Sequence, residues 1–258
     1  MKITALLENT ASDCCMLTEH GLSLYIEAQG KKILFDMGQT DLFYKNALTL
    51  GIDLAEVDIA ILSHGHYDHG GGLEKFLEIN KKAPVYISSR AFEPHYNGKE
   101  KYIGLDASLK DSPRLIFTDD SAIIDTSLSI YSYNDRERKN FLGSFGLTKS
   151  VGNGFVPDNF IHEQYLLIEE KGKRILISGC SHKGIIDIVN WARPHILVGG
   201  FHLSKITDST ELDKIGRLLS EGGTKYYTCH CTGETQYEYL KKLIPSLEYL
   251  RCGDSIEI

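Results

Sequence analysis

The stretch Ile61-Leu62-Ser63-His64-Gly65-His66-Tyr67-Asp68-His69-Gly70-Gly71-Gly72 places three histidines and an aspartate directly after an apolar run. In an extended chain, residues two apart point the same way, so the side chains of His64, His66 and Asp68 can converge just past a strand end. Imidazole and carboxylate groups are costly to bury alone, and together they suit zinc, with manganese or iron as alternatives. Four such ligands overfill one tetrahedral site that keeps an open position, which favours two neighbouring divalent metal ions.

Three later segments each contain an apolar strand-like run that leads to a histidine, and an expected helix follows each one. They are Arg174–His182, His195–His202 and Tyr226–Gly233, and their histidines are His182, His202 and His230. The carboxyl ends of strands form the edge at which α/β sheets bind ligands. We therefore expect these histidines to gather with the first cluster.

Composition excludes several classes of protein. The chain has 258 residues with 42% hydrophobic and 24% charged residues, which is ordinary for a globular protein with a sizeable core. A net charge of −7 disfavours general binding to nucleic acid or to anionic membrane. No apolar segment approaches the roughly 18–20 residues of a membrane span, and the N-terminus does not resemble a signal peptide. We expect a cytoplasmic protein with free thiols; the oligomeric state stays open.

The pattern along the chain begins with strands and then alternates strand and helix. This predicts one α/β domain over residues 1–258 with sheets in the middle and helices outside. The expected helices span 41–50, 71–80, 184–192, 211–221 and 235–243. Two segments, at about 90–113 and 134–160, lack a clear pattern and are expected to be lid loops over a site.

The sequence resembles the metallo-β-lactamase fold superfamily through Ser63–His69. Several further segments are similar to the branch named for 7,8-dihydropterin-6-methyl-4-(β-D-ribofuranosyl)-aminobenzene-5′-phosphate synthase. These are Gly21–Ser23, Leu34–Gly38, Gly179–Gly184, Gly199–Leu203, Cys229–Gly233 and Gly253–Ile256. The resemblance thus runs nearly end to end. It implies a four-layer αββα sandwich, of the α/β (α+β) class, with a dinuclear metal site at one sheet edge.

The resemblance also implies a division of the ligands between the two ions. His64 and His66 go to one ion, Asp68 and His69 to the other, and His230 completes the second set. Asp68 is expected to serve catalysis as well as metal binding.

One position departs from the superfamily pattern. Cys180 stands where an aspartate usually bridges the two ions, which weakens the second site unless Cys180 binds as a thiolate. We expect His182 to be the third ligand of the first ion, with His162 as the alternative because it precedes a strand.

Other residues receive supporting roles. Asp36 resembles an aspartate that orients a ligand histidine, and His202 is a candidate proton donor or substrate clamp. Ser181 and Lys183 precede a helix whose free amides could hold a phosphate. Arg136, Arg138 and Lys139 are possible anion contacts, whereas His20, His95 and His195 are expected to be ordinary residues.

These features predict a metal-dependent hydrolase that uses a metal-activated hydroxide on a small anionic substrate, phosphorylated or pyrophosphorylated. Two alternatives remain. One is a synthase that joins a dihydropterin pyrophosphate to an aryl-ribose phosphate. The other is a metal-bound sensor or binding protein that does not catalyse.

Overall fold

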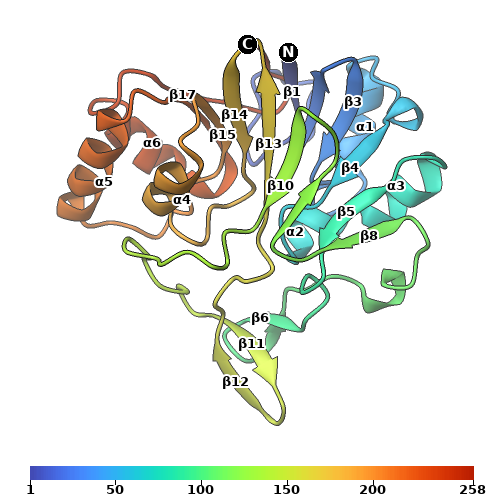
Figure 1. Ribbon diagram of the computed structural model, residues 1–258, viewed down its shortest axis with the longest axis horizontal. Helices are drawn as coiled ribbons and strands as arrows, with labels where there is room; N and C mark the ends of the chain where they lie inside the picture. Colours follow the sequence, from blue (N-terminus) through green and yellow to red (C-terminus); the bar gives the residue numbers. More distant parts are fainter.

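Two seven-stranded mixed sheets form the centre of the molecule in a computed structural model that describes residues 1–258 (Figure 1). The first sheet has the order β18-β1-β2-β3-β4-β5-β8. Its strands are β1 (Lys2–Leu7), β2 (Ser23–Ala28), β3 (Lys31–Phe35), β4 (Ile59–Ile61), β5 (Val85–Ser88), β8 (Leu115–Thr118) and β18 (Ser255–Glu257). Both chain termini lie together at one end of this sheet region, at the top of Figure 1.

The second sheet has the order β17-β16-β15-β14-β13-β10-β9. Its strands are β9 (Ser121–Ile123), β10 (Leu128–Tyr131), β13 (Tyr165–Glu170), β14 (Lys173–Ile177), β15 (Ile196–Gly199), β16 (Lys225–Thr228) and β17 (Leu247–Tyr249). Strands β14, β15, β16 and β17 run parallel to one another, so their carboxyl ends meet at one edge.

Helices cover the outer face of each sheet, on the two sides of Figure 1. The first sheet carries α1 (Leu42–Thr49) and α3 (Leu73–Ile79), and the single turn α2 (Tyr67–Gly70) lies at its edge. The second sheet carries α4 (Ile185–Ala192), α5 (Ser209–Glu221) and α6 (Glu234–Leu240). Short 3₁₀ turns occupy Leu54–Glu56, Ala107–Leu109 and His230–Thr232. No helix is both long enough and apolar enough to cross a membrane.

Alternation along the strands explains why the sheets pack in layers. In β14, Ile175 and Ile177 join the apolar cluster between the two sheets, whereas Leu176 joins the cluster under the helices. Successive side chains of a strand point to opposite faces, so one strand supplies both layers. The cluster between the sheets and the two clusters under the helices together make the αββα sandwich, which confirms the predicted fold class.

A small third sheet extends from the sandwich at the end opposite the termini (Figure 1). It has the order β12-β11-β6-β7, with β6 (His95–Asn97), β7 (Lys101–Tyr102), β11 (Leu147–Val151) and β12 (Gly154–Pro157). Both segments that we predicted to be irregular contribute to it, so that part of the prediction was wrong. These strands are short and largely exposed, and therefore carry no clean alternation of apolar and polar residues.

Strand register brings distant segments to the same edge. Phe35 of β3 pairs with Ile61 of β4, so Asp36 emerges beside the His64 segment. Gly199 of β15 pairs with Thr228 of β16, which places the segments after these strands next to each other.

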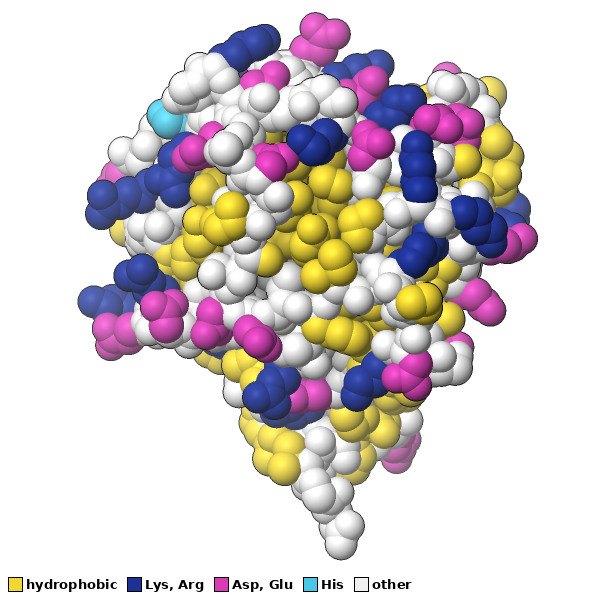
Figure 2. All heavy atoms as spheres, turned by 45° about the vertical axis from the view of Figure 1, so that its right-hand side comes forward, with side chains coloured by type: hydrophobic (Ala, Val, Ile, Leu, Met, Phe, Trp, Pro, Cys, Tyr) yellow, Lys and Arg dark blue, Asp and Glu magenta, His cyan; other side chains and the backbone are white.

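One edge strand of each large sheet, β8 in the first and β9 in the second, exposes apolar side chains. Ile116, Phe117 and Ile123 are 40%, 43% and 69% exposed. Figure 2 shows apolar side chains gathered in the middle of one face and bordered by charged ones. None of these three residues lines the cavity described below.

Candidate metal centre

The segments after β4 and β14 bring together a first group of histidines: His64, His66 and His182. All three are buried, and they offer ring nitrogens within 4.8 Å of one another. The Nε2 atoms of His64 and His182 are 3.3 Å apart.

A second group lies beside the first and consists of Asp68, His69 and His230. Asp68 Oδ2 is 3.8 Å from His69 Nε2 and 3.4 Å from His230 Nε2, and the two Nε2 atoms are 3.2 Å apart. Cys180 Sγ is 3.1 Å from His69 Nε2 and also lies within 4.8 Å of His64. The thiol is therefore between the two groups.

Hydrogen bonds fix which ring nitrogens carry lone pairs. His69 Nδ1 donates to the Asp36 carboxylate at 2.7 Å, and His230 Nδ1 donates to Asn9 Oδ1 at 2.8 Å. Each neutral ring then has its lone pair on Nε2. When both rings are neutral, as metal ligands must be, the two Nε2 atoms face each other with no hydrogen between them.

The same holds for His64. Ser63 Oγ donates to Asp36 Oδ2 at 2.7 Å, so it accepts from His64 Nδ1 at 2.8 Å and leaves the lone pair on His64 Nε2. Ligand atoms about 2.0–2.1 Å from a tetrahedral ion are roughly 3.3 Å apart. The observed spacings of 3.2 Å and 3.3 Å match that value, so these residues fit a pair of metal ions.

Burial keeps the first group neutral. It lowers the pKa of His64, His66 and His182 well below the ordinary imidazole value, and neighbouring imidazoles lower it further. A neutral ring has the lone pair that a metal ligand needs.

The second group favours positive charge. Burial alone would lower the pKa of His69, but the carboxylates of Asp36 and Asp68 raise it to about 9. Burial alone would raise the pKa of Asp68, but the neighbouring imidazoles of His69, His20 and His230 hold it well below its usual range. Two ionised carboxylates around one imidazole make this position suitable for a cation.

Two buried glutamates hold the loops that carry the later histidines. Glu163 Oε1 accepts the His182 backbone N–H at 2.8 Å, and Glu8 Oε1 accepts that of His230. His230 itself has a φ of +50°, a left-handed conformation that is costly without glycine. The hydrogen bonds of His230 to Glu8 and Asn9 hold the backbone in this conformation.

His66, Asp68, His182 and His230 of the two groups line a cavity of about 210 Å³, whereas His64 and His69 are fully buried and do not line it. Its wall includes Asn97 and Lys101 of the small sheet and Leu147 of β11, so part of each predicted lid segment does border the site. The remaining lining residues are His20, His66, Tyr67, Asp68, Ile103, Cys180, His182, His202, Ser204, Lys205, His230 and Cys231.

Some predicted residues lie elsewhere. Ser181 and Lys183 do not line the cavity. Ser181 shares a hydrogen bond with Ser178, and the buried Lys183 Nζ donates to the carbonyl oxygens of Ser132 and Glu163. Neither residue can reach a substrate in the cavity. Arg136, Arg138 and Lys139 also lie outside its lining.

His162, the alternative to His182, turns one ring nitrogen to the backbone and the other toward Asp158. Nδ1 accepts the Gly65 backbone N–H at 2.9 Å, and Nε2 lies 3.4 Å from Asp158 Oδ2. His202 lines the cavity with its ring 4.2 Å from that of His182.

Two histidines that we expected to be ordinary lie close to the centre, His20 in the cavity lining and His95 in contact with the ring of His66. His20 Nε2 is 3.2 Å from Asp68 Oδ2, and the buried His95 donates from Nδ1 to Asp158 Oδ2 at 2.7 Å. His95 and Asp158 are 63 positions apart, and neither stands in a motif, so no sequence signal joins them. His195 lies apart from the site, where it accepts the Arg174 backbone N–H.

The sandwich and the clustered histidines define a class of protein, and the sequence agrees. Residues 18–220 match the metallo-β-lactamase superfamily, and the chain belongs to that superfamily.

Three similar proteins extend the comparison. The uncharacterized protein MJ0448 of Methanocaldococcus jannaschii is 33% identical over 90% of each chain. The 7,8-dihydropterin-6-methyl-4-(β-D-ribofuranosyl)-aminobenzene-5′-phosphate synthase of the same organism is 28% identical over 100% of this chain and 96% of its own. The crystal structure of Tm1679, described as a metal-dependent hydrolase of the β-lactamase superfamily, superposes with a TM-score of 0.85. It is 30% identical and covers 100% of this chain and 99% of its own.

Proposed function

We propose that the protein is a metal-dependent hydrolase that acts on a small anionic substrate, phosphorylated or pyrophosphorylated. The observation that carries this proposal is the two pairs of facing Nε2 atoms, His64 with His182 and His69 with His230, of which His182 and His230 line one cavity. Tm1679, the similar protein of known structure, bears the description of a hydrolase.

The first ion would be held by His64, His66 and His182. The second would be held by Asp68, His69 and His230, with Cys180 beside them. When bound, two such ions lower the pKa of a shared water and polarise the oxygen of the group under attack. Zinc is the metal that this donor set suits best, with manganese or iron as alternatives.

The chain's own side chains would bind and orient the substrate. Lys101 and Lys205 line the cavity and provide two positive charges, and Asn97 and Ser204 add hydrogen-bonding groups. Lys205 Nζ is held by the Phe145 carbonyl oxygen at 3.0 Å. A phosphate is bound well by such a set because ammonium groups donate to its oxygens and offset its charge.

Two histidines at the cavity wall could donate a proton to the leaving group. His202 has a buried Nδ1 without a partner, and His20 is hydrogen-bonded to Asp68. Asp68 fixes the His20 ring, which makes His20 the more constrained of the two.

The test is turnover of phosphoesters, pyrophosphates and lactones by metal-loaded protein, with and without chelator. We expect activity on a phosphorylated substrate that chelator abolishes. K101A and K205A should raise KM several-fold with a smaller effect on kcat, because uniform binding is lost. K82A, at an exposed surface pair with Glu56, is the matched control. Absence of chelator-sensitive turnover across the panel would reject the proposal.

A synthase reaction is the second candidate because the M. jannaschii synthase aligns with the whole of this chain. Ligand pockets usually measure about 300–1,000 Å³, and the cavity of about 210 Å³ favours one small substrate over two joined ones. Mass analysis of products separates the two reactions, since condensation yields a heavier organic product. Bound metal without any turnover would instead support the sensor or binding protein.

A further inference from the structure

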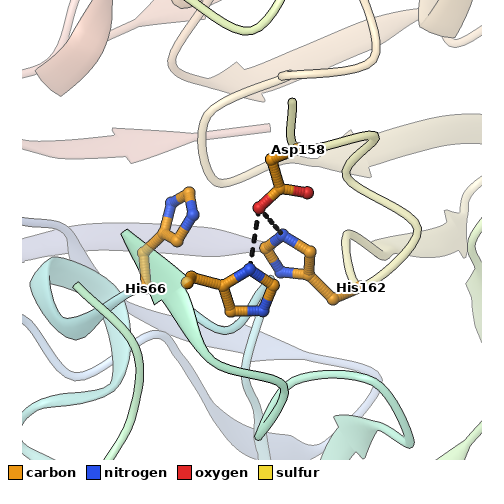
Figure 3. A group of neighbouring side chains, drawn as sticks. His66, Asp158 and His162 are labelled. Atoms are coloured by element: carbon orange, nitrogen blue, oxygen red, sulfur yellow. Dashed lines mark hydrogen bonds and ion pairs between the residues drawn. The ribbon is translucent and has the colours of Figure 1, made fainter. Parts of the chain in front are cut away.

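A second buried polar cluster shares His66 with the candidate centre, and its other three members have no part in the proposed chemistry. It consists of His66, His95, Asp158 and His162, all at most 3% exposed. Each offers one nitrogen or oxygen atom within 4.8 Å of those of the others. Figure 3 shows His162 reaching the Asp158 carboxylate, with His66 beside the same group.

Asp158 is an ionised acceptor at the centre of this cluster. Its Oδ1 accepts the Phe160 backbone N–H at 2.8 Å, and its Oδ2 accepts from His95 Nδ1 at 2.7 Å. Burial alone would raise the pKa of Asp158, but the hydrogen bonds from His162 and His95 hold it far below its usual range.

The proton on His162 also points at Asp158. His162 Nδ1 accepts the Gly65 backbone N–H, so the neutral ring carries its hydrogen on Nε2, 3.4 Å from Asp158 Oδ2. Two imidazole N–H groups therefore converge on one carboxylate oxygen. They fix its position from two sides.

His66 is the remaining member, and its Nε2 is buried without a hydrogen-bond partner. A buried polar group of this kind needs an acceptor or a donor. His95 and His162 both turn N–H groups toward the carboxylate. The cluster then offers His66 two acceptors, the Asp158 carboxylate and the Nε2 lone pair of His95. Of these, Asp158 carries a negative charge and is the stronger acceptor.

We propose that Asp158 positions His66 by accepting the hydrogen on its Nε2, which leaves the Nδ1 lone pair for the first metal ion. His66 and Asp158 are not hydrogen-bonded as they stand. The ligand atoms of the two residues lie within 4.8 Å of each other, and we expect the His66 ring to turn toward Asp158 when metal binds, since hydrogen bonds at active sites often tighten on loading. A carboxylate behind a ligand histidine fixes the tautomer and raises the basicity of the ligand. Asp158 is thus a positioning residue, and His95 and His162 hold it in place.

A third metal ion in the cluster is the competing interpretation, and the hydrogen bonds disfavour it. Nδ1 of His162 is occupied by Gly65, so its Nε2 cannot present a lone pair. His95 Nδ1 is 2.7 Å from Asp158 Oδ2, a hydrogen-bond distance that is shorter than the spacing of two ligands on one ion.

The inference rests on the proposed function because it concerns a ligand of the proposed metal centre. The experiment measures the dissociation constants of both zinc ions in D158N by competition with a chromophoric chelator. We expect one ion to bind about 10–100-fold more weakly and the other to be little changed. The matched control is D187N. Asp187 is a buried carboxylate that accepts two hydrogen bonds from Asn140 and lies outside the cavity lining.

The positions of the hydrogens on the histidine rings provide a second measurement. They would not depend on Asp158 if this residue only stabilised the fold. In long-range ¹H–¹⁵N spectra of the zinc-loaded protein, we expect hydrogen on His66 Nε2, on His95 Nδ1 and on His162 Nε2. This measurement uses the wild-type protein, so it remains available if D158N fails to fold.

The outcomes separate the two proposals. Wild type that binds no zinc overturns the proposed function and this inference with it. Two zinc ions in wild type with unchanged affinities in D158N, or hydrogen on His66 Nδ1, overturns the inference alone. Three ions in wild type and two in D158N would make Asp158 a ligand instead.

Discussion

At the scale of single residues, Cys180 gives a direct test of the proposed second ion. Its Sγ lies 3.1 Å from His69 Nε2, and the family resemblance implies a bridging aspartate at this position. A thiolate is a strong ligand for zinc, whereas a serine hydroxyl is a weak one. We predict that C180S weakens binding of one zinc ion at least about tenfold, as measured by metal content and by chelator competition.

Cys229 provides the control for that substitution. It is also buried, but it belongs to the apolar cluster between the sheets. C229S should lower stability and leave zinc affinity unchanged. Equal loss of zinc in both variants would show that Cys180 acts only through packing.

Lys183 yields a prediction about pH. Burial lowers its pKa to about 7 from the ordinary 10.5. Between pH 7 and pH 10.5, Lys183 is protonated in the unfolded chain and neutral in the folded one. The free energy of unfolding therefore rises with pH across this window, and this gain is lost as pH falls toward 7. We predict that the free energy of unfolding of wild type, relative to K183M, increases between pH 7 and pH 10.

Urea denaturation of both proteins at several pH values checks this. Subtracting K183M removes the titration of groups that the two proteins share. A difference that is flat across this window would show that Lys183 keeps its ordinary pKa when folded.

The histidines of the centre differ in how far the sequence could reveal them. His64, His66 and His69 stand within one short motif, so local spacing was enough to group them. His95 and Asp158 come from segments without recognisable periodicity. Only the folded chain brings their side chains within 2.7 Å, so their pairing could not be read from spacing.

At the scale of elements, the turn between β4 and α2 depends on Gly65. A Cβ at this position would lie 2.1 Å from the Ala91 carbonyl oxygen, which is part of the backbone and cannot move aside easily. The Gly65 N–H also donates to His162. We predict that G65A lowers the free energy of unfolding by about 2 kcal/mol or more, the range of severe point mutants.

G154A is the matched control for that substitution. Gly154 is the first residue of β12. The atom nearest to a Cβ added there would be the Val151 carbonyl oxygen at 3.9 Å, which is an ordinary contact distance. Urea denaturation should show almost no change for G154A. Similar losses in the two variants would mean that contact with Ala91 is not the cause.

Elements with strong apolar periodicity were predictable, and short exposed ones were not. The expected helix at 211–221 is present as α5, Ser209–Glu221, which Asp208 caps by accepting the Thr210 backbone N–H. In contrast, β7 has two residues, both exposed. Such a strand forms because β6 offers it a partner, and that information is not local.

At the scale of the whole molecule, the candidate centre joins the two halves of the sandwich. His64 and Asp68 follow a strand of the first sheet, whereas His182 and His230 follow strands of the second. Each proposed ion therefore takes ligands from both sheets. The sequence suggested this convergence, because strand ends carried the histidines, but the pairing of the two sheets came from the family resemblance.

An ion that bridges the sheets must stabilise the fold, since the unfolded chain cannot present the same ligands together. Binding at 100 times the dissociation constant contributes about 2.7 kcal/mol per ion. For a chain of this size, 1 kcal/mol corresponds to about 2–4 °C in Tm. We predict that a chelator lowers Tm by roughly 5–10 °C per ion, as measured by calorimetry.

The double variant H64A/H230A lacks one ligand from each group and is the control. Chelator should not change its Tm. An unchanged Tm of wild type in chelator would show that the ions do not link the sheets. The shared edge would then be held by hydrogen bonds between the sheets, such as that from His230 Nδ1 to Asn9 Oδ1.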